Sequence, residues 1–179
     1  MERLLGRLCF YLGGAKSGKT RAALEAAESW PGPWVYLATA QARDEEMRAR
    51  ILAHQRERGE SWRTVEAPRE LAAALLGLPG QSPVLLDCLT LWVSNLLEEM
   101  AEPCNLELVA LETERLLRAT AERPGPVVMV SGEVGLGLVP MEPLSRFYRD
   151  ALGRVNQMVA AQAAEAWLVV AGLRLSLKR

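Results

Sequence analysis

The residues with the most recognisable chemistry form a glycine-rich run, GGAKSGKT, made up of Gly13, Gly14, Ala15, Lys16, Ser17, Gly18, Lys19 and Thr20. The run matches the pattern G-x-x-x-x-G-K-[ST], follows an apolar segment typical of a strand and opens a segment of helical composition. Glycines let the backbone fold around phosphates, and the start of a helix offers unpaired N–H groups to their oxygens. We expect Lys19 to reach the β- and γ-phosphates and the Thr20 hydroxyl to ligate Mg²⁺. A glycine-rich turn that binds nothing is the alternative, and the complete motif in its strand–helix context argues against it.

An acidic residue ends another apolar run, Val84-Leu85-Leu86-Asp87. Proteins with this glycine-rich phosphate-binding motif, the P-loop, hold their metal ion with such an acid. We therefore expect Asp87 to bind Mg²⁺ or its water shell. The alternative is that Asp87 caps a helix that begins near Thr90.

His54 is the only histidine of the chain, in a segment of helical composition. Imidazole is a competent nucleophile, so beside a bound nucleoside triphosphate it could attack the α-phosphorus and expel pyrophosphate. Arginines at positions 50, 56 and 58 could offset the phosphate charge, although each also suits a solvated helical face. The structural alternative for His54 is a place at the edge of an apolar stripe with Met47 and Ile51.

The elements expected to position these residues alternate along the chain. Apolar runs predict five strands, at Leu8–Leu12, Trp34–Ala38, Val84–Leu86, Pro126–Val130 and Ala166–Val170. Segments of helical composition are Lys19–Ser29, Asp44–Glu57, Arg69–Leu76, Leu91–Met100, Leu106–Glu122 and Leu144–Glu165. The strand runs are nearly continuous in hydrophobicity, as in parallel strands covered on both faces. The pattern predicts an α/β, P-loop NTPase-like fold with a mostly parallel sheet flanked by helices on both faces, and leaves the strand order open.

Length and composition bound the remaining expectations. The 179 residues suit a single domain spanning residues 1–179. A net charge of −1 argues against a nucleic-acid partner. No apolar run approaches the roughly 20 residues of a membrane span. Three scattered cysteines without a CxxC pair suit reduced thiols, so we expect a cytoplasmic protein.

Several strings together resemble the bifunctional adenosylcobinamide kinase/adenosylcobinamide-phosphate guanylyltransferase family. The resemblance runs in one order from Leu12 to Lys178, and its most specific parts are the segment from Asp44 to Glu66, EVGLGLVP and GRVNQ. The strings that carry it are GGAKSGKT, YLATA, DEEMRARILAHQRERGESWRTVE, LLDCLT, EVGLGLVP, RFYRD and GRVNQ.

This resemblance implies two reactions in the late nucleotide-loop branch of cobalamin synthesis. ATP or GTP phosphorylates adenosylcobinamide, and GTP then donates GMP to adenosylcobinamide phosphate, giving adenosylcobinamide-GDP and pyrophosphate. The guanylyl group would pass through a phosphoramidate on His54. The resemblance also implies a P-loop α/β fold assembled as a homotrimer. The nucleotide contacts that it implies are the run from Gly13 to Thr20, Ala38, Thr39, Ala40, Gln55, Arg56, Glu57, Arg58, Glu66 and Asp87.

Two positions depart from the family pattern. Gly132 stands where the family usually carries Asn, so a side-chain amide is missing before EVGLG. Ala40 stands where Ser is common, so a hydroxyl contact is missing there. Neither change touches the P-loop, His54 or Asp87.

The string EVGLGLVP follows an apolar strand, the place where open α/β sheets carry ligand-contacting loops. Gly135 and Gly137 permit close backbone approach. One interpretation is a loop, beginning at Glu133, that lines the corrinoid side of the site. A purely structural turn ended by Pro140 is the other.

Two other functions remain compatible with the motifs. One is a P-loop kinase of a small acceptor, without the guanylyl step and with a structural His54. The other is a GTP-binding regulatory module, which the absence of an NKxD base-recognition motif disfavours. Dependence of nucleotidyl transfer on His54 separates the bifunctional enzyme from the kinase, and transfer to any acceptor separates both enzymes from the regulatory module.

Overall fold

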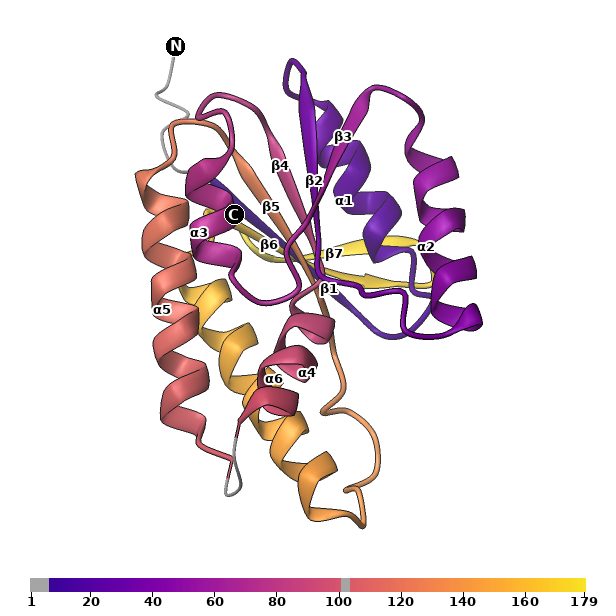
Figure 1. Cartoon of the computed structure of the whole chain (residues 1–179), viewed down its shortest axis with the longest axis vertical. Helices are drawn as coiled ribbons and strands as arrows, with labels where there is room; N and C mark the ends of the chain where they lie inside the picture. Colours follow the sequence, from indigo (N-terminus) through magenta and orange to yellow (C-terminus); the bar gives the residue numbers. More distant parts are fainter. Residues whose placement is uncertain (1–6, 101–103) are drawn as a thin grey trace.

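A computed structural model describes residues 7–100 and 104–179, and its strands form one seven-stranded sheet with helices on both faces (Figure 1). The strands lie in the order β3-β2-β4-β5-β1-β6-β7. Along the chain the elements are β1 (Leu8–Gly13), α1 (Lys19–Glu28), β2 (Trp34–Ala38), α2 (Glu45–Arg58), β3 (Trp62–Glu66), α3 (Leu71–Gly77), β4 (Val84–Asp87), α4 (Leu89–Glu99), α5 (Leu106–Glu122), β5 (Val127–Gly132), α6 (Pro143–Gln162), β6 (Glu165–Val170) and β7 (Leu173–Lys178).

Strands β1 to β6 run parallel, and only β7 is antiparallel to its neighbour. Strands β1 and β5 are buried along their whole length because each is covered on both faces. Their continuous apolar runs match this burial. The expected α/β fold with a mostly parallel sheet is confirmed, and all five predicted strands are present.

The two strands that the apolar runs did not reveal are β3 and β7, which lie at the two edges of the sheet. Their sequences, WRTVE and LRLSLK, mix polar and apolar residues, and most of their side chains are exposed. An edge strand with exposed side chains needs no continuous apolar run, whereas the five predicted strands all have one. The exposure of β3 and β7 therefore explains why the sequence pattern did not predict them.

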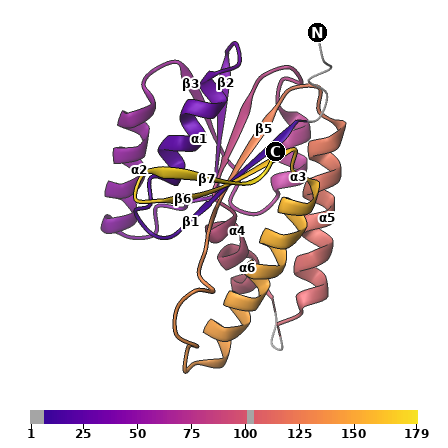
Figure 2. The same ribbon diagram turned by 180° about the vertical axis from the view of Figure 1, so that it is seen from behind.

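The two faces of the sheet are covered unequally. Helix α1 packs its alanines and Leu24 into one core cluster, together with residues of β1, β2 and β5. Helices α3, α4, α5 and α6 share the larger cluster on the other face, and the view from behind shows α5 and α6 side by side (Figure 2). Among the residues that the structure describes, no helix is long and apolar enough to cross a membrane.

Candidate nucleotide site at the carboxyl ends of the strands

The run from Gly13 to Thr20 forms a strand–loop–helix, as its sequence predicts. Strand β1 ends at Gly13 and helix α1 begins at Lys19, with left-handed backbone at Lys16 (φ 53°) and Gly18 (φ 91°) between them. Gly13 has no room for a side chain, since a Cβ there would lie 2.5 Å from the carbonyl oxygen of Val169. The Lys19 ammonium donates a hydrogen bond to the Gly14 carbonyl at 3.0 Å, so the lysine folds back over the loop.

The turn between β6 and β7 braces this loop from the side. The Gly172 N–H donates to the Ser17 carbonyl at 2.8 Å. A Cβ at Gly18 would lie 3.3 Å from the Gly172 Cα, so the two glycines let the segments touch. Ala171 and Gly172 both have left-handed backbone, which makes the turn tight enough to reach the loop. This contact depends on β7, which the apolar runs did not predict.

Asp87 ends β4 at the same edge of the sheet. In register, Asp87 pairs with Val130 of β5, and Gly13 pairs with Gly132 two residues further along that strand. One strand therefore separates the acid from the phosphate loop. The Asp87 carboxylate and the Thr20 hydroxyl are hard oxygen donors of the kind that Mg²⁺ takes together with phosphates and water, so the residues present fit that ion.

The Asp87 carboxylate accepts a hydrogen bond from the Tyr36 hydroxyl, with 2.6 Å between the tyrosine oxygen and Oδ2. Burial, followed by the neighbouring Asp87 carboxylate, raises the pKa of Tyr36 above its ordinary value, so the hydroxyl keeps its proton and acts as the donor. The next residue, Cys88, has its pKa raised to about 12, chiefly by burial and then by Asp87. Its thiol is therefore protonated at neutral pH and is no nucleophile there.

The end of β2 is tied to β4 and α4 through Thr39, which is fully buried. The Thr39 hydroxyl donates to the Cys88 carbonyl and accepts from the Cys88 N–H, both at 2.8 Å. Its own N–H donates to the Asp87 carbonyl at 3.1 Å. These bonds keep Thr39 occupied within the protein, while its neighbours Ala38 and Ala40 are half-buried at the edge of the sheet.

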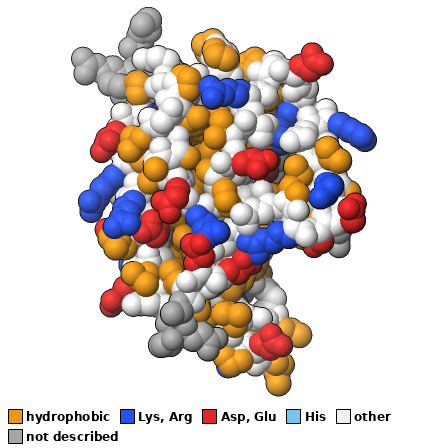
Figure 3. Space-filling view, viewed as in Figure 1, with side chains coloured by type: hydrophobic (Ala, Val, Ile, Leu, Met, Phe, Trp, Pro, Cys, Tyr) orange, Lys and Arg blue, Asp and Glu red, His pale blue; other side chains and the backbone are white. Residues whose placement is uncertain are grey.

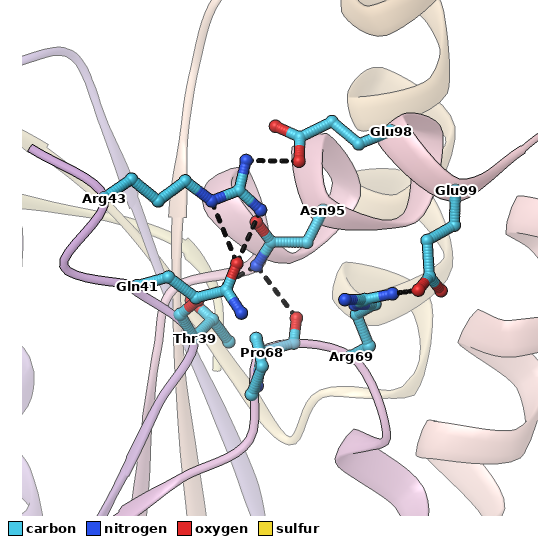
Figure 4. Close-up of polar contacts among 8 residues, drawn as sticks. All are labelled: Thr39, Gln41, Arg43, Pro68, Arg69, Asn95, Glu98 and Glu99. Carbon is cyan, nitrogen blue, oxygen red and sulfur yellow. Dashed lines mark hydrogen bonds and ion pairs between the residues drawn. The ribbon is translucent and has the colours of Figure 1, made fainter.

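Asn95 of α4 is a residue of this edge that sequence reasoning missed. Its side-chain amide donates to the carbonyls of Thr39 and Pro68, each at 2.9 Å, so it joins the ends of β2 and β3 (Figure 4). In the same view Arg43, which precedes α2, pairs with Glu98 of α4. A lone amide within the apolar helix LTLWVSNLLEE was the available signal, because buried amides in helices need partners.

Helix α2 carries His54 in its third turn, and Asp44 caps its start by accepting a hydrogen bond from the Met47 N–H at 2.6 Å. The side chains of Glu46, Arg50, His54 and Glu57 lie outside the described part of the structure. Gln55 and Arg56 are exposed, as is Glu66 at the end of β3.

Arg58, the last residue of α2, is buried against the tyrosine that contacts Asp87. Its guanidinium carbon lies 3.4 Å from the centroid of the Tyr36 ring. It also donates to the Thr64 hydroxyl at 3.4 Å. The far end of the histidine-bearing helix therefore contacts the tyrosine whose hydroxyl bonds the acid predicted to hold the metal.

The segment from 133 to 142 leaves the carboxyl end of β5 and reaches α6. The Glu133 carboxylate accepts from the Gly135 N–H at 2.6 Å, so the loop begins with a small turn. Leu136, Leu138 and Met141 are each more than four-fifths exposed. Hydrophobic side chains gather at the lower tip of the molecule, where this loop meets α6 (Figure 3).

Gly132, where the family usually has Asn, is crowded by Thr90. The Gly132 N–H donates to the Thr90 hydroxyl at 2.6 Å, and a Cβ at Gly132 would lie 2.9 Å from the same oxygen. Asn156 of α6 donates to the Gly132 carbonyl at 3.1 Å. With Thr90 in its present position, only a residue without a Cβ fits at position 132 without a shift.

A phosphate loop between β1 and α1, with an acid ending a nearby strand, defines this chain as a P-loop nucleotide-binding protein of the α/β class. The crystal structure of the flagellar accessory protein FlaH from Methanocaldococcus jannaschii has a similar fold, with a TM-score of 0.54 and 12% sequence identity. That match covers 99% of this chain and 82% of FlaH. The expected P-loop NTPase-like fold is confirmed.

The particular family follows from sequence. The family model "cobinamide kinase / cobinamide phosphate guanyltransferase" matches residues 9–177. The bifunctional adenosylcobalamin biosynthesis protein CobU of Escherichia coli (strain K12) is 40% identical over 176 residues, covering 93% of this chain and 97% of that protein. The protein CobP of Pseudomonas aeruginosa, described in the same words, is 44% identical over 168 residues, covering 93% of this chain and 95% of the relative. A third relative, CobU of Salmonella typhimurium, is 41% identical over 176 residues, with 93% and 97% covered.

The chain therefore belongs to the cobinamide kinase/cobinamide phosphate guanyltransferase family of bifunctional enzymes in cobalamin biosynthesis. The resemblance drawn from its sequence motifs is confirmed.

Proposed function

We propose that this chain phosphorylates the aminopropanol hydroxyl of adenosylcobinamide with ATP or GTP and then transfers GMP from GTP to that phosphate. In the first step the acceptor oxygen attacks the γ-phosphorus, the nucleoside diphosphate leaves and the hydroxyl proton is released. In the second, GMP becomes attached and pyrophosphate leaves, giving adenosylcobinamide-GDP. The observation that carries the proposal is the braced phosphate loop beside Asp87, in a chain of this family.

In this proposal the phosphate loop binds the nucleotide in both steps. Its backbone N–H groups and the start of α1 hold the phosphates, and Lys19 leaves the Gly14 carbonyl to meet the β- and γ-oxygens. Thr20 and Asp87 would hold Mg²⁺. When bound, this ion neutralises charge on the phosphate oxygens.

His54 is the nucleophile that we propose for the guanylyl step. One imidazole nitrogen attacks the α-phosphorus of GTP, a P–N bond forms and pyrophosphate leaves; the acceptor phosphate then breaks that bond and regenerates the histidine. Two observations support this role. His54 is the only histidine in the chain, and it lies on α2, whose last residue contacts Tyr36, the tyrosine that is hydrogen-bonded to Asp87. The further nucleotide contacts that we propose are Ala38, Ala40, Gln55, Arg56, Glu57, Arg58 and Glu66. The buried Thr39 would act there by holding Ala38 and Ala40 in place.

Radiolabelled GTP tests the covalent step. Protein incubated with Mg²⁺ and α-labelled GTP should retain label after denaturation, stable to alkali and lost in mild acid, whereas γ-labelled GTP should leave none. His54→Ala should abolish the labelling. Leu52→Ala, at an exposed position of the same helix, is the matched control and should label normally. Unchanged labelling of His54→Ala would refute the histidine intermediate, and only the kinase reaction would then remain as the proposed function.

We further propose that one domain carries both reactions, that the protein is cytoplasmic and that it assembles as a homotrimer. Sedimentation equilibrium tests the assembly, since a trimer has three times the 19.7 kDa mass of the chain. The loop from Glu133 to Glu142 is proposed to face the corrinoid, because its exposed leucines lie beyond the carboxyl end of β5. Leu136→Ser with Leu138→Ser should raise the KM for adenosylcobinamide and leave the KM for GTP unchanged.

A further inference from the structure

Tyr36 is a buried residue of β2 that belongs to none of the predicted sets of site residues. Only 5% of it is exposed, and its hydroxyl oxygen lies 2.6 Å from Oδ2 of Asp87. Asp87 is paired in register with Ala38, two residues after the tyrosine on the same strand. The hydroxyl therefore reaches along the sheet to the carboxylate and occupies one of its two oxygens.

The tyrosine ring is itself fixed by two neighbours. The Arg58 guanidinium lies over the ring, 3.4 Å from its centroid, and Trp62 of β3 meets it edge-on, with the ring centroids 6.3 Å apart and an interplanar angle of 83°. Both neighbours are buried. A ring held in this way places its hydroxyl in one position, and a hydrogen bond to a charged acceptor then fixes the carboxylate.

We propose that Tyr36 is a positioning residue that orients Asp87, so that Oδ1 is presented to the metal–nucleotide complex at the phosphate loop. The proposal rests on the role proposed above for Asp87. Groups that hydrogen-bond a metal-binding carboxylate fix its direction and contribute to metal affinity. Because Arg58 lies on the same ring, Tyr36 also connects the end of α2 to this carboxylate.

A simpler explanation is that Asp87 merely satisfies a buried hydroxyl, as any core tyrosine requires. The two explanations differ in what the hydroxyl does for the ligand. A structural hydrogen bond would affect nucleotide binding equally with and without metal. A positioning hydrogen bond affects only the metal-dependent part of that binding.

The experiment measures the affinity of a fluorescent, non-hydrolysable GTP analogue in Mg²⁺ and in EDTA. Tyr36→Phe keeps the ring, and with it the contacts to Arg58 and Trp62, and removes only the hydroxyl. We expect its affinity in Mg²⁺ to fall by about tenfold, at the lower end of effects of groups behind a metal ligand. Its affinity in EDTA should equal that of the unmodified protein. Tyr11→Phe, which removes the hydroxyl of an equally buried tyrosine in the same core cluster, is the control and should change neither.

A double-mutant cycle with Asp87→Asn completes the test. If Tyr36 acts through Asp87, the double variant should bind in Mg²⁺ no more weakly than Asp87→Asn alone. Equal loss in Mg²⁺ and EDTA for Tyr36→Phe, or additive losses in the cycle, would overturn the positioning role. If Mg²⁺ raises the affinity of Asp87→Asn for the GTP analogue as much as it does for the unmodified protein, the proposed metal role of Asp87 fails. That failure is visible independently of Tyr36. Thermal unfolding of each variant checks that the fold is retained.

Discussion

The phosphate loop and helix α2, the two segments proposed to carry the chemistry, are held in the fold in different ways. The loop is enclosed by backbone: the Val169 carbonyl stands against Gly13, and Gly172 bonds Ser17 and touches Gly18. Helix α2 is held at its ends, by the Asp44 cap and by Arg58, and Arg58 is its only buried residue among those whose side chains are described. The proposed phosphate site is therefore part of the sheet, whereas the proposed guanylyl nucleophile lies on a largely exposed helix. The variants below separate these two kinds of support.

The largest expected effect comes from Lys19→Ala set against His54→Ala. The lysine variant should lower kcat of both reactions by about 10³-fold, because both lose a preorganised cation at the phosphates. The histidine variant should keep its kinase activity and lose guanylyl transfer. Assays of adenosylcobinamide phosphorylation and of pyrophosphate release measure the two reactions separately.

Arg21→Ala is the control for this pair, because it removes an exposed cation, paired with Glu25, from the first turn of α1. It should behave as the unmodified protein. Loss of kinase activity in His54→Ala would show that the two segments do not divide the chemistry.

Gly13→Ala set against Gly14→Ala tests the enclosure of the loop. A Cβ at Gly13 would lie 2.5 Å from a backbone oxygen, so we expect unfolding free energy to fall by about 3 kcal/mol. A Cβ at Gly14 meets nothing within 4 Å, and its effect should stay within about 0.5 kcal/mol. Urea denaturation of both variants measures the difference, and equal stability would contradict the close packing described here.

The smallest expected effect compares one glycine beside each segment, Gly172 and Gly59. Gly172 (φ 79°) and Gly59 (φ 72°, ψ 179°), just after α2, both have a positive φ, and a Cβ on either meets nothing within 4 Å. Alanine strains the backbone at both positions, at a cost of about 1 to 3 kcal/mol of unfolding free energy each. Only Gly172→Ala should also weaken nucleotide binding, because only that turn bonds the loop. Titration with fluorescent GTP measures this, and equal weakening by Gly59→Ala would remove the distinction.

Most of the fold was predictable from sequence because the central strands are continuous apolar runs and the helices lie between them. The edge strands β3 and β7 were not predicted, since their exposed faces carry Arg, Glu and Lys. The strand–loop–helix form of the P-loop, the place of Asp87 at the end of a strand and the helix that bears His54 were also predictable from motif and spacing, whereas the roles of these residues stay predictions.

Contacts between distant segments were not predictable. Tyr36 looked like any apolar strand residue, and its bond to Asp87 depends on β2 pairing with β4, an order that the sequence leaves open. Asn95 and Gly172 likewise act on segments far away in the chain. Local patterns say which groups can do chemistry, whereas strand order decides which groups meet.

The contact between Ser17 and Gly172 has a consequence for the order of events during synthesis. The phosphate loop emerges from the ribosome early, but its brace is made by a turn that emerges only after six of the seven strands. A nascent chain that stops before Ala171 has the whole motif without this support. Tight nucleotide binding should therefore arise late in translation, when the final hairpin has paired along β6.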